Sequence, residues 1–157
     1  MLKKYLFVFL VSMVPIVELR GAMPIAMGMD IEFFPALVTC VLGNMLPVPI
    51  IYFFARKFLK WGANQRYIGK FCNFFLEKGE RAGKKLVSKT GRGGLFLALL
   101  LFVGIPIPGT GARTGTLGAS FLDMGFKSTV LSVSLGVILA GCIMALASTG
   151  VFHFIGL

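Results

Sequence analysis

Apolar residues gather into four stretches along the chain, and only some of these stretches are continuous. The stretches are 5–29, 33–55, 94–122 and 128–152. The second and the fourth are long enough to cross a membrane, because about 20 apolar residues span a hydrocarbon core about 30 Å thick. We therefore predict that these two stretches form transmembrane helices.

The first and the third stretches are interrupted near their middles. The interrupting residues are Pro15, Gly21 and Pro24 in the first stretch and Pro106, Pro108, Gly109 and Gly111 in the third. Proline removes a backbone donor and glycine weakens a helix, so each stretch is expected to form two short helical arms around a break. The arm 5–14 would reach about 15 Å, half a bilayer, which favours a re-entrant hairpin. The alternatives are kinked spanning helices and, for the first stretch, a secretory signal.

The two halves of the chain repeat when the sequence is shifted by 93 residues. Eleven of the 51 positions between Tyr5 and Ala55 are then identical to their counterparts. The polar and turn-forming matches are Pro15 with Pro108, Arg20 with Arg113, and Asp30 with Asp123. An arginine inside a membrane is costly and usually functional, so its recurrence carries more weight than matched leucines.

This repeat predicts an architecture for the whole chain. A repeat made of one hairpin and one crossing traverses the membrane an odd number of times, so the second repeat is inverted relative to the first. We predict an all-α integral membrane protein with a single membrane domain, 1–157. It would contain two inverted repeats, 5–55 and 98–148, joined by a basic amphipathic link, 56–93. Broken helices of inverted repeats meet the substrate near the membrane midplane in secondary transporters.

Composition and charge agree with a membrane protein. The chain is 57% hydrophobic and has a mean hydropathy of +0.88, far from the average of a soluble domain. Its net charge is +10, but the segment 56–92 alone holds eleven basic and two acidic residues. A basic segment between apolar stretches follows the positive-inside rule, so we expect a multi-pass protein of the cell membrane with this link in the cytoplasm and no nucleic-acid partner.

An alternative topology with four spanning segments also has support from the sequence. Lys3 and Lys4 would also prefer the cytoplasm, and four spanning segments with both termini inside would place them there. Phe58, Trp61 and Phe71 recur at near-helical spacing among the basic residues of the link. This pattern is typical of an amphipathic helix in the lipid headgroups, and a solvated linker helix is the alternative.

Residues that would support catalysis or metal binding do not form a recognisable pattern. Cys40, Cys72 and Cys142 are far apart in the sequence and imply neither a metal site nor a disulfide framework. We find no nucleophile with a paired base and no phosphate-binding loop. The sequence therefore predicts a protein that is not an enzyme and that needs no cofactor or metal.

Two motifs carry a family resemblance that covers nearly the whole chain. The N-terminal "P-I-x-E-L-R-G-A-x-P" run and the later "G-I-P-I-P-G-T-G-A-R-T-G" run resemble the small multidrug export proteins, a branch similar to the DedA/VTT membrane superfamily. The resemblance implies two facing re-entrant hairpins and the transport or flipping of lipid-linked or other amphipathic anions, with proposed proton coupling. Pro108-Gly109 and Arg113-Thr114 resemble the Pro-Gly-x-Arg-Thr motif of DedA relatives with two extra residues, and the arginine that precedes that motif is absent.

The charged residues near the breaks are the candidate site. Arg20 and Arg113, approaching from opposite leaflets, would form a cationic site for an anionic headgroup, which guanidinium binds in a bidentate manner. Glu18 is the expected proton carrier, because its protonation responds to both burial and a nearby arginine. Asp30 and Asp123 are further candidates for coupling, and capping of the next helix is their alternative role.

The functional prediction is a small membrane transporter or flippase-like protein for an amphipathic or anionic substrate, a class that includes lipid-linked anions. Membrane lipids and a second copy of the chain are the other expected partners. The alternative function is a non-transporting membrane scaffold or assembly factor, in which the buried charges form structural bridges between the hairpins.

Overall fold

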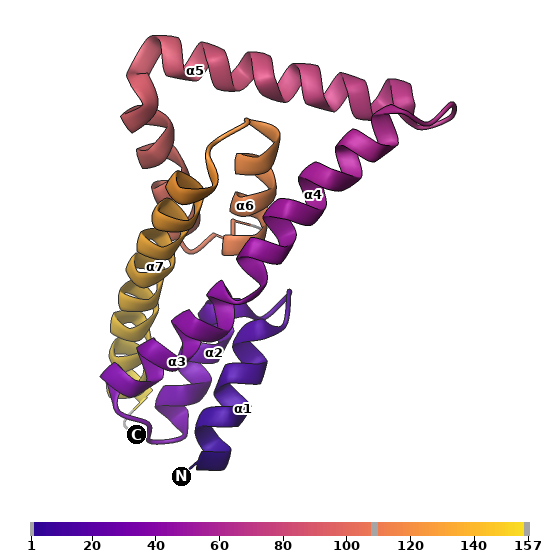
Figure 1. The fold of residues 1–157 in the computed structure, drawn as a ribbon. Helices are drawn as coiled ribbons and strands as arrows, with labels where there is room; N and C mark the ends of the chain where they lie inside the picture. The colour runs from indigo at the N-terminus through magenta and orange to yellow at the C-terminus, as the bar shows by residue number, and fades with distance from the viewer. Residues whose placement is uncertain (1, 108–109, 156–157) are drawn as a thin grey trace.

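The part of the chain that the structure describes is all-helical (Figure 1). The structure is a computed structural model that describes residues 2–107 and 110–155. Its helices are α1 (Leu2–Met13), α2 (Glu18–Gly28), α3 (Phe33–Met45), α4 (Pro47–Ala63), α5 (Gly69–Gly104), α6 (Ala112–Phe121) and α7 (Phe126–Ile155).

Helices α1 and α2 form a hairpin around a short turn, 14–17. Pro15 ends α1, because its ring restricts the preceding residue and offers no amide donor. The predicted break is wrong in extent, since Gly21 and Pro24 lie inside α2. The buried face of α2 packs against α3 and α7, and this packing keeps the helix continuous despite the hydrogen bond that Pro24 removes.

Helices α5 and α6 form a second hairpin, and the described residues of its turn are 105–107, 110 and 111. Helix α5 bends at Gly91, whose φ of +72° lies in the left-handed region that glycine adopts readily. The residues after this bend form the first arm of the hairpin. Pro106 and Gly111 lie in the turn as predicted, and the predicted break residues Pro108 and Gly109 lie outside the described residues.

The two turns face each other in the middle of the molecule (Figure 1). The first hairpin starts from the end that holds both termini, and the second starts from the opposite end, where the first part of α5 lies across the bundle. In each hairpin the first arm packs on the long helix that follows it, α1 on α3 and α5 on α7. The second arms pack on helices of the other half of the chain, α2 on α7 and α6 on α4. Each half therefore contributes to the packing of the other.

Among the described residues, three helical segments are long and apolar enough to cross a membrane: Phe33–Ala63, Val87–Gly104 and Phe126–Gly150. The first combines α3 and α4, which bend only at Leu46, before Pro47. The predicted helix 33–55 therefore continues into the predicted link. Val87–Gly104 includes the first arm of the second hairpin, so its length and composition also permit a crossing.

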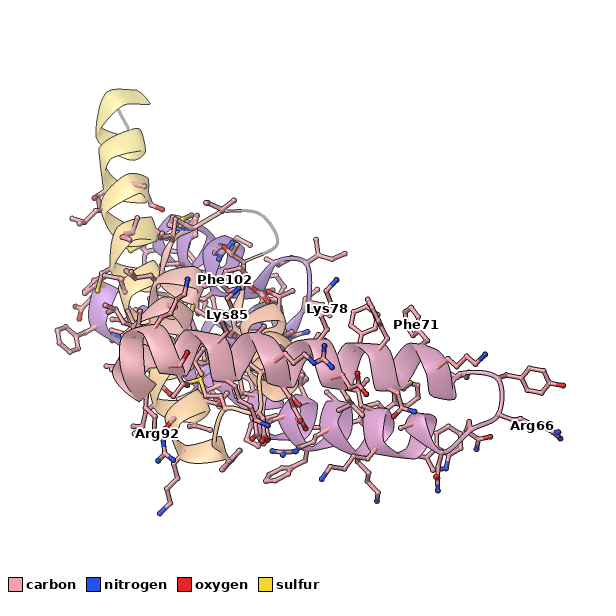
Figure 2. The ribbon with its side chains drawn as sticks, turned by 90° about the horizontal axis from the view of Figure 1, so that it is seen from above. Arg66, Phe71, Lys78, Lys85, Arg92 and Phe102 are labelled. Carbon is pink, nitrogen blue, oxygen red and sulfur yellow. The ribbon has the colours of Figure 1, made fainter. Side chains whose placement is uncertain are left out.

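The end of α4 and the first part of α5 form a basic, aromatic helix pair beside the loop 64–68. Seen from above, the two helices lie side by side, with Lys78 projecting from α5 and Arg66 from the loop that joins the helices (Figure 2). The pair also exposes large aromatic side chains, namely Phe58, Trp61, Tyr67, Phe71 and Phe74. Its surface combines the cationic and aromatic groups that suit a membrane interface.

Candidate functional site

Arg20 reaches from the first turn of α2 to the turn of the second hairpin. Its Nη2 donates to Thr110 Oγ1 at 2.9 Å and to Ile105 O at 3.2 Å. The same guanidinium donates to the carbonyl oxygens of Ile107 and Thr110. A turn between two helices has carbonyl groups that no helical N–H satisfies, so it requires donors from elsewhere. Arg20 supplies these donors to the opposite hairpin.

Arg113 makes the reciprocal contact from α6. Its Nη2 donates to the carbonyl oxygen of Met13, the last residue of α1. That oxygen belongs to the final helical turn, whose carbonyl groups lack intrahelical partners. The two arginines that match in the sequence repeat therefore link the two hairpins in opposite directions.

The side chain of Glu18, the first residue of α2, lies at the N-terminus of α6. Its φ of +49° is in the left-handed region, so its side chain does not follow the regular direction of α2. The carboxylate lies against Gly111, where an added Cβ would stand 1.8 Å from Glu18 Oε2. It also faces the backbone N–H of Arg113 and the charges of Arg20 and Arg113. A helix N-terminus favours an anion, so α6 and both arginines stabilise this carboxylate.

Two grooves flank the contact between the turns. One has a volume of about 620 Å³, and its lining includes Pro15, Glu18, Arg20, Gly111 and Thr114. The other, of about 680 Å³, is almost wholly apolar. It runs between α4, α5 and α6, and Arg113 belongs to its lining. Small-molecule sites commonly have volumes of this order.

The structure does not bring Asp30 and Asp123 to the two arginines. Each residue follows the last turn of a hairpin's second arm, with φ of +57° and +56° respectively. The N–H of Ile31 donates to Ala26 O at 3.1 Å, and the N–H of Met124 donates to Ala119 O at 3.0 Å. This pattern closes the preceding helix in a left-handed C-terminal cap.

The alternative role that the sequence offered for these aspartates, N-capping of the next helix, is also wrong for Asp30. The N-cap of α3 is Glu32, without a side-chain capping bond. Asp123 instead forms an ion pair with Arg56 of α4. Beside it, Tyr52 donates its hydroxyl proton to Met124 O at 2.6 Å. These contacts tie α4 to the connection between α6 and α7.

Sequence reasoning missed Thr110 and Asn44. Thr110 accepts a hydrogen bond from Arg20 and belongs to the quoted motif, but its position in the turn has no signal that separates it from its neighbours. Asn44 lies in α3 and is only 2% exposed. An amide within the apolar stretch 33–55 was the available signal for this residue, because buried polar groups in a membrane are often functional.

The arrangement suits anion binding and proton transfer better than metal binding. Within residues 2–107 and 110–155, no three His, Cys, Asp or Glu side chains gather as metal ligands would. Two guanidinium groups offer planar pairs of donors to a carboxylate or phosphate. A partly buried carboxyl group beside them can take up and release a proton.

Comparison with known proteins gives one match. The model of a family described as "Putative small multi-drug export protein" matches residues 18–143. The matched segment contains Glu18, Arg20 and Arg113, so it includes all the charged groups at the facing turns. No curated protein and no solved structure matches the chain significantly. These findings support the small multidrug export family and leave the likeness to the DedA/VTT superfamily as a prediction.

Proposed function

This chain belongs to the small multi-drug export protein family, and from that premise we propose that it carries an anionic, amphipathic solute across the cell membrane. Its three long apolar helices and its family make it a multi-pass membrane protein. The observation that carries the proposal is the reciprocal contact of Arg20 and Arg113 at the facing turns. Such a contact places two permanent cations next to grooves of ligand size.

The proposed membrane placement treats the hairpins as re-entrant and the two halves as inverted repeats. The packing supports this placement, because the pairs α1–α3 and α5–α7 correspond under the shift of 93 residues, as do α2–α7 and α6–α4. The link 56–92, with its basic surface, would then lie at the cytoplasmic face. Both turns would lie near the midplane, each reached from a different leaflet.

In this mechanism, the substrate anion competes with backbone carbonyl oxygens for the arginines. In the observed state each guanidinium donates to carbonyl groups of the opposite hairpin, and Arg113 Nε has no partner among the described residues. A phosphate, sulfonate or carboxylate accepts stronger, charge-assisted hydrogen bonds from the same donors. An anion that binds to a guanidinium therefore weakens the contact between the hairpins and allows them to separate on one side.

Glu18 supplies the coupling step of the proposal. Its charge opposes binding of an anion to the adjacent arginines, and protonation of Glu18 removes that repulsion. Uptake of a proton and binding of the anion would consequently favour each other. The process transfers a proton and a solute without forming or breaking a covalent bond, in keeping with the expectation that the protein is not an enzyme.

Reconstitution into vesicles tests this function. The protein should move a fluorescent anionic lipid, such as labelled phosphatidylglycerol, between leaflets faster than a labelled zwitterionic lipid or the cationic dye ethidium. Arg113→Ala should lower the rate at least tenfold, whereas Lys78→Ala on the exposed face of α5 serves as the matched control. Glu18→Gln should remove the dependence of the rate on pH. Movement of ethidium alone, or equal rates for the wild type and Arg113→Ala, would contradict the proposed anion site.

A scaffold is the second candidate, and one observation favours it. The described contacts of both arginines join the hairpins through backbone carbonyl oxygens, as a purely structural bridge would. A scaffold has no ligand that competes for these bonds. Thermal stability in detergent should then be unaffected by anionic amphiphiles such as an alkyl phosphate, whereas the transporter should respond to them more than to a matched alkyl phosphocholine.

A further inference from the structure

Asn44 is a buried polar residue that the proposed anion site leaves without a role. It lies in the last turns of α3 and is 2% exposed. Its Oδ1 is buried and has no hydrogen-bond partner among the described residues. An unpaired amide oxygen in an apolar environment destabilises a fold, so its presence at the centre of the protein requires an explanation.

A small cavity connects Asn44 with the charged turn of the first hairpin. Its lining includes Glu18, Arg20, Asn44, Gly111 and Val137. The volume of about 10 Å³ leaves room for roughly one water molecule. An amide oxygen and an ionised carboxylate are both acceptors, so no hydrogen bond can form between them until a donor is present. A neutral carboxyl group provides that donor through its own O–H.

We propose that Asn44 is a positioning residue of the proton site, whose Oδ1 accepts a hydrogen bond from neutral Glu18, directly or through one water molecule. The inference rests on the proposed role of Glu18 as proton carrier. It accounts for the unpaired Asn44 Oδ1, because an ionised Glu18 carboxylate has no donor to offer it. Protonation would satisfy both side chains at once.

The groups around Glu18 divide into two opposing sets. Arg20 from its own helix, and the guanidinium and backbone N–H of Arg113 from α6, favour the ionised carboxylate. Asn44 from α3 favours the neutral form. The remaining walls of the cavity are apolar, with Val103 from α5 and Val137 and Ala140 from α7. When a substrate anion binds the arginines, they stabilise the ionised carboxylate of Glu18 less. The hydrogen bond from neutral Glu18 to Asn44 then keeps Glu18 protonated.

The second half of the chain provides a natural comparison. The shift of 93 residues places Asn44 on Val137, and both residues follow a buried glycine, Gly43 and Gly136. Each glycine is in close contact with the first arm of its own hairpin, at Phe9 and Leu100 respectively. The repeat therefore tolerates valine at this position, and of the two corresponding residues, which line the same cavity, only Asn44 carries an amide. Asn44→Val makes the two halves alike without introducing a residue foreign to the fold.

The experiment compares Asn44→Val with Asn44→Ser and Glu18→Gln in proteoliposomes that carry labelled phosphatidylglycerol. Asn44→Val should fold at least as stably as the wild type, because it removes an unpaired polar atom. Its pH profile of transport should move to lower pH by about half to one unit, which corresponds to one net hydrogen bond. Asn44→Ser keeps an acceptor and leaves room for water, so its profile should stay close to that of the wild type.

Difference infrared spectroscopy gives a second readout that does not depend on transport. The carbonyl band of the neutral carboxyl group, assigned by its loss in Glu18→Gln, should move to higher wavenumber in Asn44→Val. An unchanged profile and band in Asn44→Val would overturn this inference and leave the proposed function standing. A wild-type rate without pH dependence, or pH dependence that survives Glu18→Gln, would contradict the proposed function itself. In that case the infrared band alone decides whether Asn44 contacts Glu18.

Discussion

Arg20 and Arg113 show how a charged side chain is stabilised at the centre of an apolar bundle. Each guanidinium donates to main-chain carbonyl oxygens of the opposite hairpin. The guanidinium donors and the carbonyl acceptors of the turn therefore satisfy each other, since a buried donor or acceptor without a partner lowers stability. The carboxylate of Glu18 is nearby, but the described hydrogen bonds of Arg20 do not depend on it.

This pairing predicts the outcome of a double substitution. Arg20→Ala should lower the free energy of unfolding by about 3 kcal/mol, because it removes the charge-assisted hydrogen bonds that join α2 to Ile105 and Thr110 of the second hairpin. Glu18→Gln/Arg20→Ala should be no more stable than Arg20→Ala in thermal unfolding in detergent. Recovery of stability in the double variant would instead mean that Arg20 mainly neutralises Glu18, as in a structural ion pair.

Gly111 is the residue whose small size is required by Glu18. Gly111→Ala should displace the carboxylate from the N-terminus of α6, since the added Cβ would stand 1.8 Å from Oε2. We expect a loss of about 1–3 kcal/mol in stability, as for other overpacked sites. Gly118→Ala is the control on the same helix, because an added Cβ there meets no atom within 4 Å. It should be neutral or stabilising by up to about 1 kcal/mol. Equal melting temperatures for both variants would refute the proposed fit.

At the scale of elements, the second arms of the hairpins end in the same way. Helices α2 and α6 both close with an aspartate in the left-handed conformation, at positions that correspond in the repeat. The long helices α3 and α7 begin a few residues later. The recurrence of Asp30 and Asp123 therefore reflects a backbone conformation that reverses the chain, and aspartate tolerates this conformation better than branched residues do.

Substitution at Asp30 tests this backbone role. Asp30→Val should lower stability by about 1–2 kcal/mol, the cost of the left-handed conformation for a residue with a branched Cβ. Asp30→Gly should preserve stability, because glycine adopts this conformation freely. In Asp123→Gly the same backbone gain is offset by the lost ion pair with Arg56, so a loss of up to about 1 kcal/mol is expected. A damaging Asp30→Gly would indicate that its carboxylate has a role of its own.

At the scale of the whole molecule, the two hairpins enter from opposite ends (Figure 1). Both termini lie at one end, and the basic helix pair lies at the other. The proposed orientation places the termini outside and the link in the cytoplasm. The abundance of basic residues in the link outweighs Lys3 and Lys4 in this assignment.

Accessibility of single cysteines tests the orientation. In a variant without Cys40, Cys72 and Cys142, a cysteine introduced by Lys3→Cys should react with an impermeant maleimide added to intact cells. One introduced by Lys84→Cys should react only after the membrane is opened. The reverse pattern would invert the protein in the membrane, and protection of both positions in intact cells would favour four spanning segments with both termini inside.

The sequence by itself determined the class of the protein and the positions of its special residues. Long apolar runs can satisfy their backbone only as helices in a membrane, so the helical stretches and the location of the turns near Pro15 and Pro106 follow from local chemistry. The paired arginines were evident for the same reason, since a charge in such a run is unfavourable wherever the chain folds.

Only the tertiary structure decided what those residues contact. Pro24 remains helical because α3 and α7 pack around it, and no local rule anticipates that packing. The carbonyl groups that Arg20 contacts lie more than 80 residues away in the sequence. Every residue type has a backbone carbonyl group, so the sequence does not identify these partners. Asn44 and Glu18 come together for the same reason. Hydrogen bonds to main-chain atoms and the shapes of cavities depend on how helices are placed in space, which residue identity alone does not record.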